Sequence, residues 1–142
     1  MRPGISEAVP LCVLIVEDDP ILSLDLSEQL QECNCIVCGV ANSGAKALQL
    51  AALHRPHLAL VDVGIDGGMD GIDLAVALRR NFALPSIIVT GWLSSDLAER
   101  ARSASPAGFL SKPYLPDDLE KVLREAHRML GAQGEGRSTC PT

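Results

Sequence analysis

Acidic, basic and hydroxyl side chains stand at the ends of apolar stretches in this sequence. Asp62 follows the apolar run at 58–61 and precedes a glycine-rich segment, while Glu17 and Asp18 follow another apolar run at 11–16. Carboxylates brought together repel one another, by roughly 4 kcal/mol per pair at ~4 Å and an effective dielectric near 20. A hard divalent cation relieves this repulsion, and all-oxygen ligation by carboxylates suits Mg²⁺.

Thr90 and Lys112 add a hydroxyl and a cation, each close behind a further apolar run, at 86–89 and 107–110. Lys112 can pair with Asp62 or with an incoming phosphoryl group as a point charge. Thr90 can donate a hydrogen bond to a phosphoryl oxygen. An aspartate, a metal ion, a lysine and a hydroxyl together suit in-line phosphoryl transfer onto a carboxylate oxygen.

Five apolar runs that alternate with five amphipathic segments must position these side chains. The expected strands are 11–16, 35–40, 58–62, 86–90 and 107–110, and the expected helices are 20–31, 44–53, 71–80, 95–102 and 116–130. Continuous apolar strands favour an α/β fold with a doubly wound, five-stranded parallel sheet covered on both faces. In such folds ligands bind beyond the carboxyl ends of the strands, so we expect the residues above to converge there.

The first helix shows how the local signals combine. Asp19 is expected to cap this helix, and Pro20 fits its first turn. Leu22, Leu26 and Leu30 are expected to form its apolar face. The helix should therefore pack on the sheet, directly after the acidic pair.

Length and charge limit the classes of protein to which this chain can belong. The 142 residues predict one domain at 10–131, with a short leader at 1–9 and a flexible tail at 132–142. The net charge of −6 argues against direct binding to nucleic acid. No apolar run approaches the ~18 residues of a membrane span, and no signal peptide is evident, so we expect a cytoplasmic protein without a membrane contact.

Three cysteines cluster where the first helix gives way to the second strand. Cys33, Cys35 and Cys38 invite a zinc interpretation, but a structural zinc site usually takes four ligands and no fourth Cys or His lies close by. We favour small reduced core thiols.

Taken in order, the strand-end motifs resemble the receiver domain of two-component response regulators, of the CheY-like superfamily. They are Val-Glu-Asp-Asp-Pro at 16–20, Val-Asp at 61–62 ahead of Met-Asp-Gly at 69–71, Val-Thr-Gly at 89–91 and Gly-Phe-Leu-Ser-Lys-Pro at 108–113. The resemblance covers about 10–130 and implies a flavodoxin-like fold with strand order 2-1-3-4-5. No effector domain follows, so we expect a stand-alone, single-domain type.

The resemblance also implies a role for each site residue. Asp62 would be the phosphoacceptor, with Thr90 and Lys112 binding the phosphoryl group. Mg²⁺ would be held by Asp18, Asp62 and the Gly64 carbonyl, with Glu17 assisting through water. Phe109 would be the aromatic residue whose rotamer reports the switch, and the Lys112-Pro113 peptide would be cis.

The expected function is phosphorylation-dependent signalling and not enzymatic turnover. The phosphoryl group would come from a histidine of a sensor kinase or histidine phosphotransfer protein. A downstream effector protein would read the changed surface, and the last helix, with Lys121, Arg124 and Arg128, offers a face for a partner or a second copy.

Two other functional classes stay open. The first is a receiver-like adaptor that is not phosphorylated. The second is an enzyme, either a phosphatase with an aspartyl intermediate or a flavin protein. The phosphatase would carry a second Asp where Gly64 stands, and acids occupy the place of a flavin phosphate cradle.

The sequence departs from the receiver pattern in three places. Gly67-Gly68 replace the usual proline after the acceptor and alter the expected loop. Gly64 offers no side chain to position water, and Trp92 can shield the site, so these two positions lead us to expect slow self-dephosphorylation.

Overall fold

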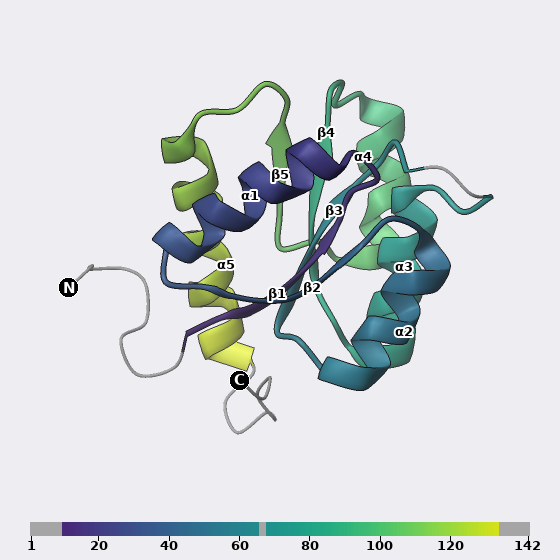
Figure 1. Ribbon diagram of the computed structural model, residues 1–142. Helices are drawn as coiled ribbons and strands as arrows, with labels where there is room; N and C mark the ends of the chain where they lie inside the picture. Colours follow the sequence, from purple (N-terminus) through teal and green to yellow (C-terminus); the bar gives the residue numbers. More distant parts are fainter. Residues whose placement is uncertain (1–9, 66–67, 134–142) are drawn as a thin grey trace.

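The computed structural model describes residues 10–65 and 68–133, where strands and helices alternate (Figure 1). The strands are β1 (Cys12–Val16), β2 (Ile36–Ala41), β3 (Leu58–Asp62), β4 (Ser86–Thr90) and β5 (Gly108–Ser111). The helices are α1 (Pro20–Glu32), α2 (Gly44–His54), α3 (Gly71–Phe82), α4 (Ser95–Ala101) and α5 (Pro116–Gln133), with a 3₁₀ turn, η1 (Arg102–Ala104). The expected leader, most of the expected tail, and Gly67 lie outside the described residues.

The strands form one parallel sheet in the order β2-β1-β3-β4-β5. The predicted fold class and strand order are confirmed. Because β1 pairs with both β2 and β3, the strand order reverses between β1 and β3. The carboxyl ends of these two strands therefore flank the point where ligands bind in such sheets.

Helices cover both faces of the sheet, which explains the continuous apolar runs of the strands. Val13 and Ile15 of β1 pack in a core with α1 and α5. Leu14 and Val16, whose side chains alternate with these, pack against α2 and α3. Figure 1 shows α1 and α5 on one side of the sheet and α2, α3 and α4 on the other.

The cap of α1 is as expected, and its apolar face is only partly buried. Asp19 Oδ1 accepts hydrogen bonds from the amides of Ile21 and Leu22, at 2.9 and 3.3 Å. Leu26 and Leu30 are buried, whereas Leu22, which lines the same cavity as Leu26, is 46% exposed. The buried stripe of α1 runs through Ser23, Leu26 and Leu30, at helical spacing, and this places Leu22 on the flank.

The two edge strands, β2 and β5, each lie one residue later than expected. An edge strand is bounded by its pairing with a single neighbour, so its own apolar residues define its ends poorly. In β2 the register also slips between Val13 and Leu14 of the partner strand, where Val37 and Gly39 are paired and Cys38 is passed over.

The three clustered cysteines are divided between the two faces of the sheet. Cys33 and Cys35 are buried with α1 and α5, while Cys38 packs in the core on the other face. Burial raises the pKa of Cys35 to about 12 and that of Cys38 to about 11, which keeps both thiols protonated. None of the helices in the described ranges is long and apolar enough to cross a membrane.

Candidate functional site

Three carboxylates meet at the carboxyl ends of β1 and β3. Glu17, Asp18 and Asp62 each offer an oxygen atom, and these atoms lie within 4.8 Å of one another. Glu17 and Asp62 are buried, and Asp18 is half-buried. The parallel pairing of β1 with β3 causes this convergence, because it aligns the two strand ends.

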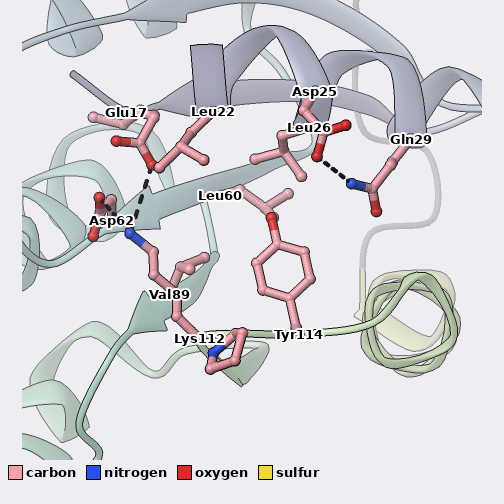
Figure 2. A pocket seen from close by; sticks show the side chains of 12 residues that line it. Glu17, Leu22, Asp25, Leu26, Gln29, Leu60, Asp62, Val89, Lys112 and Tyr114 are labelled. Carbon is pink, nitrogen blue, oxygen red and sulfur yellow. Dashed lines mark hydrogen bonds and ion pairs between the residues drawn. The ribbon is translucent and has the colours of Figure 1, made fainter. Parts of the chain in front are cut away.

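Lys112 brings a cation to the carboxylates from the end of β5. Its Nζ lies 3.0 Å from Asp62 Oδ2 and 3.8 Å from Glu17 Oε1 (Figure 2). Its backbone amide donates to the carbonyl of Thr90 at 2.8 Å, and the Lys112-Pro113 peptide is cis. Burial alone would lower the pKa of Lys112, but the hydrogen bond and charge of Asp62, with Glu17 and Asp18, raise it.

Backbone amides hold the two buried carboxylates in place. The Asp19 amide donates to Glu17 Oε2 at 3.1 Å, and the Gly64 amide donates to Asp62 Oδ1 at 3.1 Å. Burial raises the pKa of Glu17, and the negative charge of Asp62 adds to the effect, while the Asp19 amide and Lys112 oppose it. Glu17 is therefore ionised less readily than an exposed glutamate.

The donor set fits a hard cation. Three carboxylates face one lysine, so an excess of negative charge remains in a partly buried space. Their oxygen atoms are the ligands that Mg²⁺ prefers. The described contact of Gly64 is through its amide, so the role of its carbonyl stays a prediction.

Thr90 is buried at the same end of the sheet, but its hydroxyl serves a local turn. Oγ1 donates to the carbonyl of Trp92 and accepts from its amide, both at 3.1 Å. Trp92 is 78% exposed, so most of its surface is open to solvent, and its role in shielding the site stays a prediction.

Phe109 lies in β5 beside Ile88 of β4 and is partly buried. It packs against a small core in which Ile72 of α3 and Ala101 of α4 take part. Phe109 thus connects the sheet with α4, and its role as a switch stays a prediction.

A cavity of about 400 Å³ next to Asp62 and Lys112 was not predicted. It lies between α1 and the segment from Lys112 to Tyr114, and the Tyr114 ring reaches toward α1 (Figure 2). Burial raises the pKa of Tyr114, with smaller contributions from the charges of Asp25, Glu17 and Asp62. The sequence did offer one signal for Tyr114 as a site residue, because it follows Lys112 by only two positions.

Comparisons with known proteins agree with this geometry. The family model of the response regulator receiver domain matches residues 13–124. The transcriptional regulatory protein PdtaR of Mycobacterium tuberculosis is 39% identical over 119 residues, which cover 84% of this chain and 58% of PdtaR. The phyllosphere-induced regulator PhyR of Methylorubrum extorquens is 30% identical over 115 residues, which cover 80% of this chain and 42% of PhyR. The chain thus spans about half the length of these relatives.

Solved structures show the same architecture. The signal receiver domain of a modulated diguanylate cyclase from Desulfovibrio desulfuricans G20 is 32% identical and superimposes with a TM-score of 0.80. The alignment covers 87% of this chain and 98% of that one. The chemotaxis protein CheY4 of Vibrio cholerae is 26% identical and superimposes with a TM-score of 0.76. The alignment covers 83% of this chain and 99% of CheY4.

Proposed function

This chain belongs to the response regulator receiver domain family, and from that premise we propose that it accepts a phosphoryl group on Asp62 in two-component or phosphorelay signalling. One observation carries the proposal: Lys112 Nζ lies 3.0 Å from the buried Asp62 carboxylate, beside two further carboxylates. A buried lysine–aspartate pair is already neutral and gives no reason for two further carboxylates beside it. A divalent cation that assists transfer would account for their negative charge.

In the proposed reaction a carboxylate oxygen of Asp62 attacks the phosphorus of a phosphohistidine. An O–P bond forms, the P–N bond breaks, and its electron pair leaves with the imidazole of the donor. Lys112 offsets negative charge on the phosphoryl oxygens. Asp18, Asp62 and the Gly64 carbonyl would hold Mg²⁺, with Glu17 acting through water, and the ion would supply further positive charge there.

The signal would be a change of surface, not a chemical product, so the domain is proposed as a cytoplasmic signalling module and not as an enzyme. Thr90 would give up its bonds to Trp92 and turn toward the phosphoryl group, and Phe109 would repack against α4. An effector protein would then read the altered surface. The net charge of −6 supports a protein reader over nucleic acid.

Exposed apolar side chains near the cavity suggest where the phosphodonor docks. Leu22 lines the cavity and is 46% exposed, while Leu115, next to Tyr114, is 67% exposed. Covering such apolar side chains in a complex removes them from water, which favours binding. Leu115→Asp should slow transfer from a phosphorylated histidine protein while leaving uptake from acetyl phosphate unchanged.

The face of α5 is proposed as a second contact surface, for a reader or for a second copy of the chain. Arg124 and Arg128 already pair with Glu120 and Glu125 of the same helix, at 3.2 and 2.8 Å. Charge on this face is therefore partly neutralised. The concentration dependence of mass in solution, with and without phosphorylation, tests the dimer.

A receiver-like adaptor that is not phosphorylated is the second candidate function. The observation in its favour is the Thr90 hydroxyl, which is bonded to Trp92. Incubation with Mg²⁺ and acetyl phosphate, followed by intact mass, separates the two. The wild type should gain one phosphoryl group, and Asp62→Asn or the wild type with EDTA should gain none. An unchanged wild-type mass at saturating donor would favour the adaptor.

A further inference from the structure

Arg100 of α4 reaches across to the first turn of α3. Its Nη2 lies 2.9 and 3.2 Å from the two carboxylate oxygens of Asp70 and 3.4 Å from Asp73 Oδ1. Asp70 is also the N-cap of α3, since its Oδ1 accepts the Asp73 amide at 2.9 Å. One carboxylate thus fixes the start of α3 and binds α4.

The start of α3 lies directly against the backbone of the acceptor strand. The Gly71 amide donates to the Val63 carbonyl at 3.1 Å. A Cβ at Gly71 would collide with the Asp62 carbonyl and would lie 2.7 Å from Val63 Cα. Because no side chain separates these backbones, the end of β3 cannot move far without moving the first turn of α3.

The apolar contacts of α4 come from the buried Ala101 and the partly buried Leu97, which pack in the small core with Ile72 of α3. The helix has seven residues, of which only Ala101 is buried, and a helix this short depends on its tertiary contacts. A second arginine, Arg79 of α3, donates to the carbonyls of Ala104 and Ser105 at 3.1 and 2.7 Å. Polar bonds from Arg100 and to the carbonyls of Ala104 and Ser105 therefore tie the C-terminal half of the α4–η1 segment to α3.

We propose that Arg100 is a positioning residue that couples α4 to the backbone of the phosphoacceptor through Asp70 and Gly71. The proposal rests on the proposed function of Asp62. In the unphosphorylated protein the ion pair holds α4 on α3. When a phosphoryl group shifts the backbone at Asp62, the first turn of α3 and Arg100 carry the shift to α4.

The size of the effect follows from exposure. The side chains of Arg100 and Asp70 are 48% and 38% exposed, so solvent screens their attraction. Loss of the ion pair should raise the equilibrium constant for local opening of α4 by about two- to fivefold, which is the range expected for a partly exposed ion pair.

Amide hydrogen exchange in the unphosphorylated protein tests the tether. Arg100→Gln should raise exchange about two- to fivefold both in α4 and in the first turn of α3, and Arg100→Lys should restore part of the protection. Arg102→Gln is the matched control, because Arg102 pairs only locally with Glu99, at 3.3 Å, in the set of ion pairs described here. Unchanged exchange in Arg100→Gln, or an equal effect of Arg102→Gln, would overturn the proposal.

Phosphoryl uptake from acetyl phosphate tests the coupling. A loosened α4 should let Arg100→Gln take up phosphoryl groups about two- to fivefold faster than Arg102→Gln and the wild type. Faster exchange with unchanged uptake would refute coupling to Asp62. If the wild type takes up no phosphoryl group, the proposed function fails, while the exchange data still decide whether Arg100 tethers α4.

Discussion

The amino group of Lys112 lies 3.0 Å from Asp62 Oδ2, although the two residues are 50 positions apart in the chain. The contact joins the ends of β5 and β3, which are not neighbours in the sheet, because β4 lies between them. The lysine side chain therefore spans the end of β4, where Thr90 is located. A phosphoryl group on Asp62 would meet side chains from three strands at once.

Removing the lysine should separate metal binding from phosphorylation. Lys112→Met leaves Asp62 and Glu17 without their cation, so Mg²⁺ should bind more tightly by calorimetry. Phosphoryl uptake should fall by about 100-fold, as expected when one preorganised donor is lost. Lys121→Met, which changes an exposed lysine of α5, should alter neither quantity. Weaker Mg²⁺ binding in Lys112→Met would contradict the assigned role.

Mg²⁺ should stabilise the folded protein through the acidic cluster. At ten times its Kd a ligand that binds only the native state adds about 1.4 kcal/mol to the free energy of unfolding. Asp18→Asn removes one of the three carboxylates and should abolish most of this gain in urea unfolding. Asp19→Asn keeps a good N-cap and should retain it. An equal gain in stability from Mg²⁺ in the two variants would show that Asp18 is not a ligand of the ion.

We predict that Gly64 keeps loss of the phosphoryl group slow. A Cβ at this position would lie 3.8 Å from Asp62 Oδ1, so a polar side chain there would reach the acceptor. Gly64→Asn should orient water and speed loss of the phosphoryl group by roughly one to two orders of magnitude. Gly64→Ala adds the Cβ without a polar group and should leave the decay slow. A wild-type half-life of seconds would exclude this role.

The ion pair of Asp70 should give a small dependence of stability on pH. Partial burial opposes ionisation, but hydrogen bonds from the Asp73 amide and Arg100 outweigh it and lower the pKa of Asp70 below its ordinary 3.8. The resulting stability is present above pH 3.8 and is lost as pH falls through the lower, folded-state pKa. Asp70→Asn keeps the cap but loses the charge.

Urea unfolding of the wild type and Asp70→Asn measures this contribution. The wild type should be more stable at neutral pH by under about 1 kcal/mol, since Asp70 is 38% exposed and screened. The difference should vanish in acid and shrink in high salt. A difference that grows in acid would have the wrong sign.

The unequal burial along the apolar face of α1 makes a prediction about stability. Leu30 is fully buried, so Leu30→Ala should lower the free energy of unfolding by about 2–5 kcal/mol. Leu22 is 46% exposed, so Leu22→Ala should change it by less than about 0.5 kcal/mol. Similar losses of stability in both variants would contradict the difference in burial between Leu22 and Leu30.

β3 and β4 could be predicted to the residue, whereas β1 begins one residue later than expected and both edge strands are displaced by one residue. β3 and β4 are buried on both faces, so apolar residues fill them and polar residues mark their carboxyl ends at Asp62 and Thr90. β2 is half-buried, and its pairing with β1 is interrupted at Cys38. Such an irregularity depends on how two strands meet, which hydrophobic pattern alone does not encode.

The same distinction applies to the candidate site. The rule that parallel strands align their carboxyl ends was enough to bring Asp62, Glu17 and Lys112 together. The bond of Thr90 to Trp92 and the ion pair of Arg100 with Asp70 depend on rotamers and on the placement of loops. These details follow from packing, and the residue spacing gave no sign of them.

The hydroxyl of Thr90 has a single proton, and that proton is donated to the carbonyl of Trp92. It cannot be donated to an oxygen on Asp62 at the same time. Trp92 is the only tryptophan of the chain, and its backbone is bonded to the hydroxyl that would turn under the proposed function. Its fluorescence should therefore change on phosphorylation of the unlabelled protein.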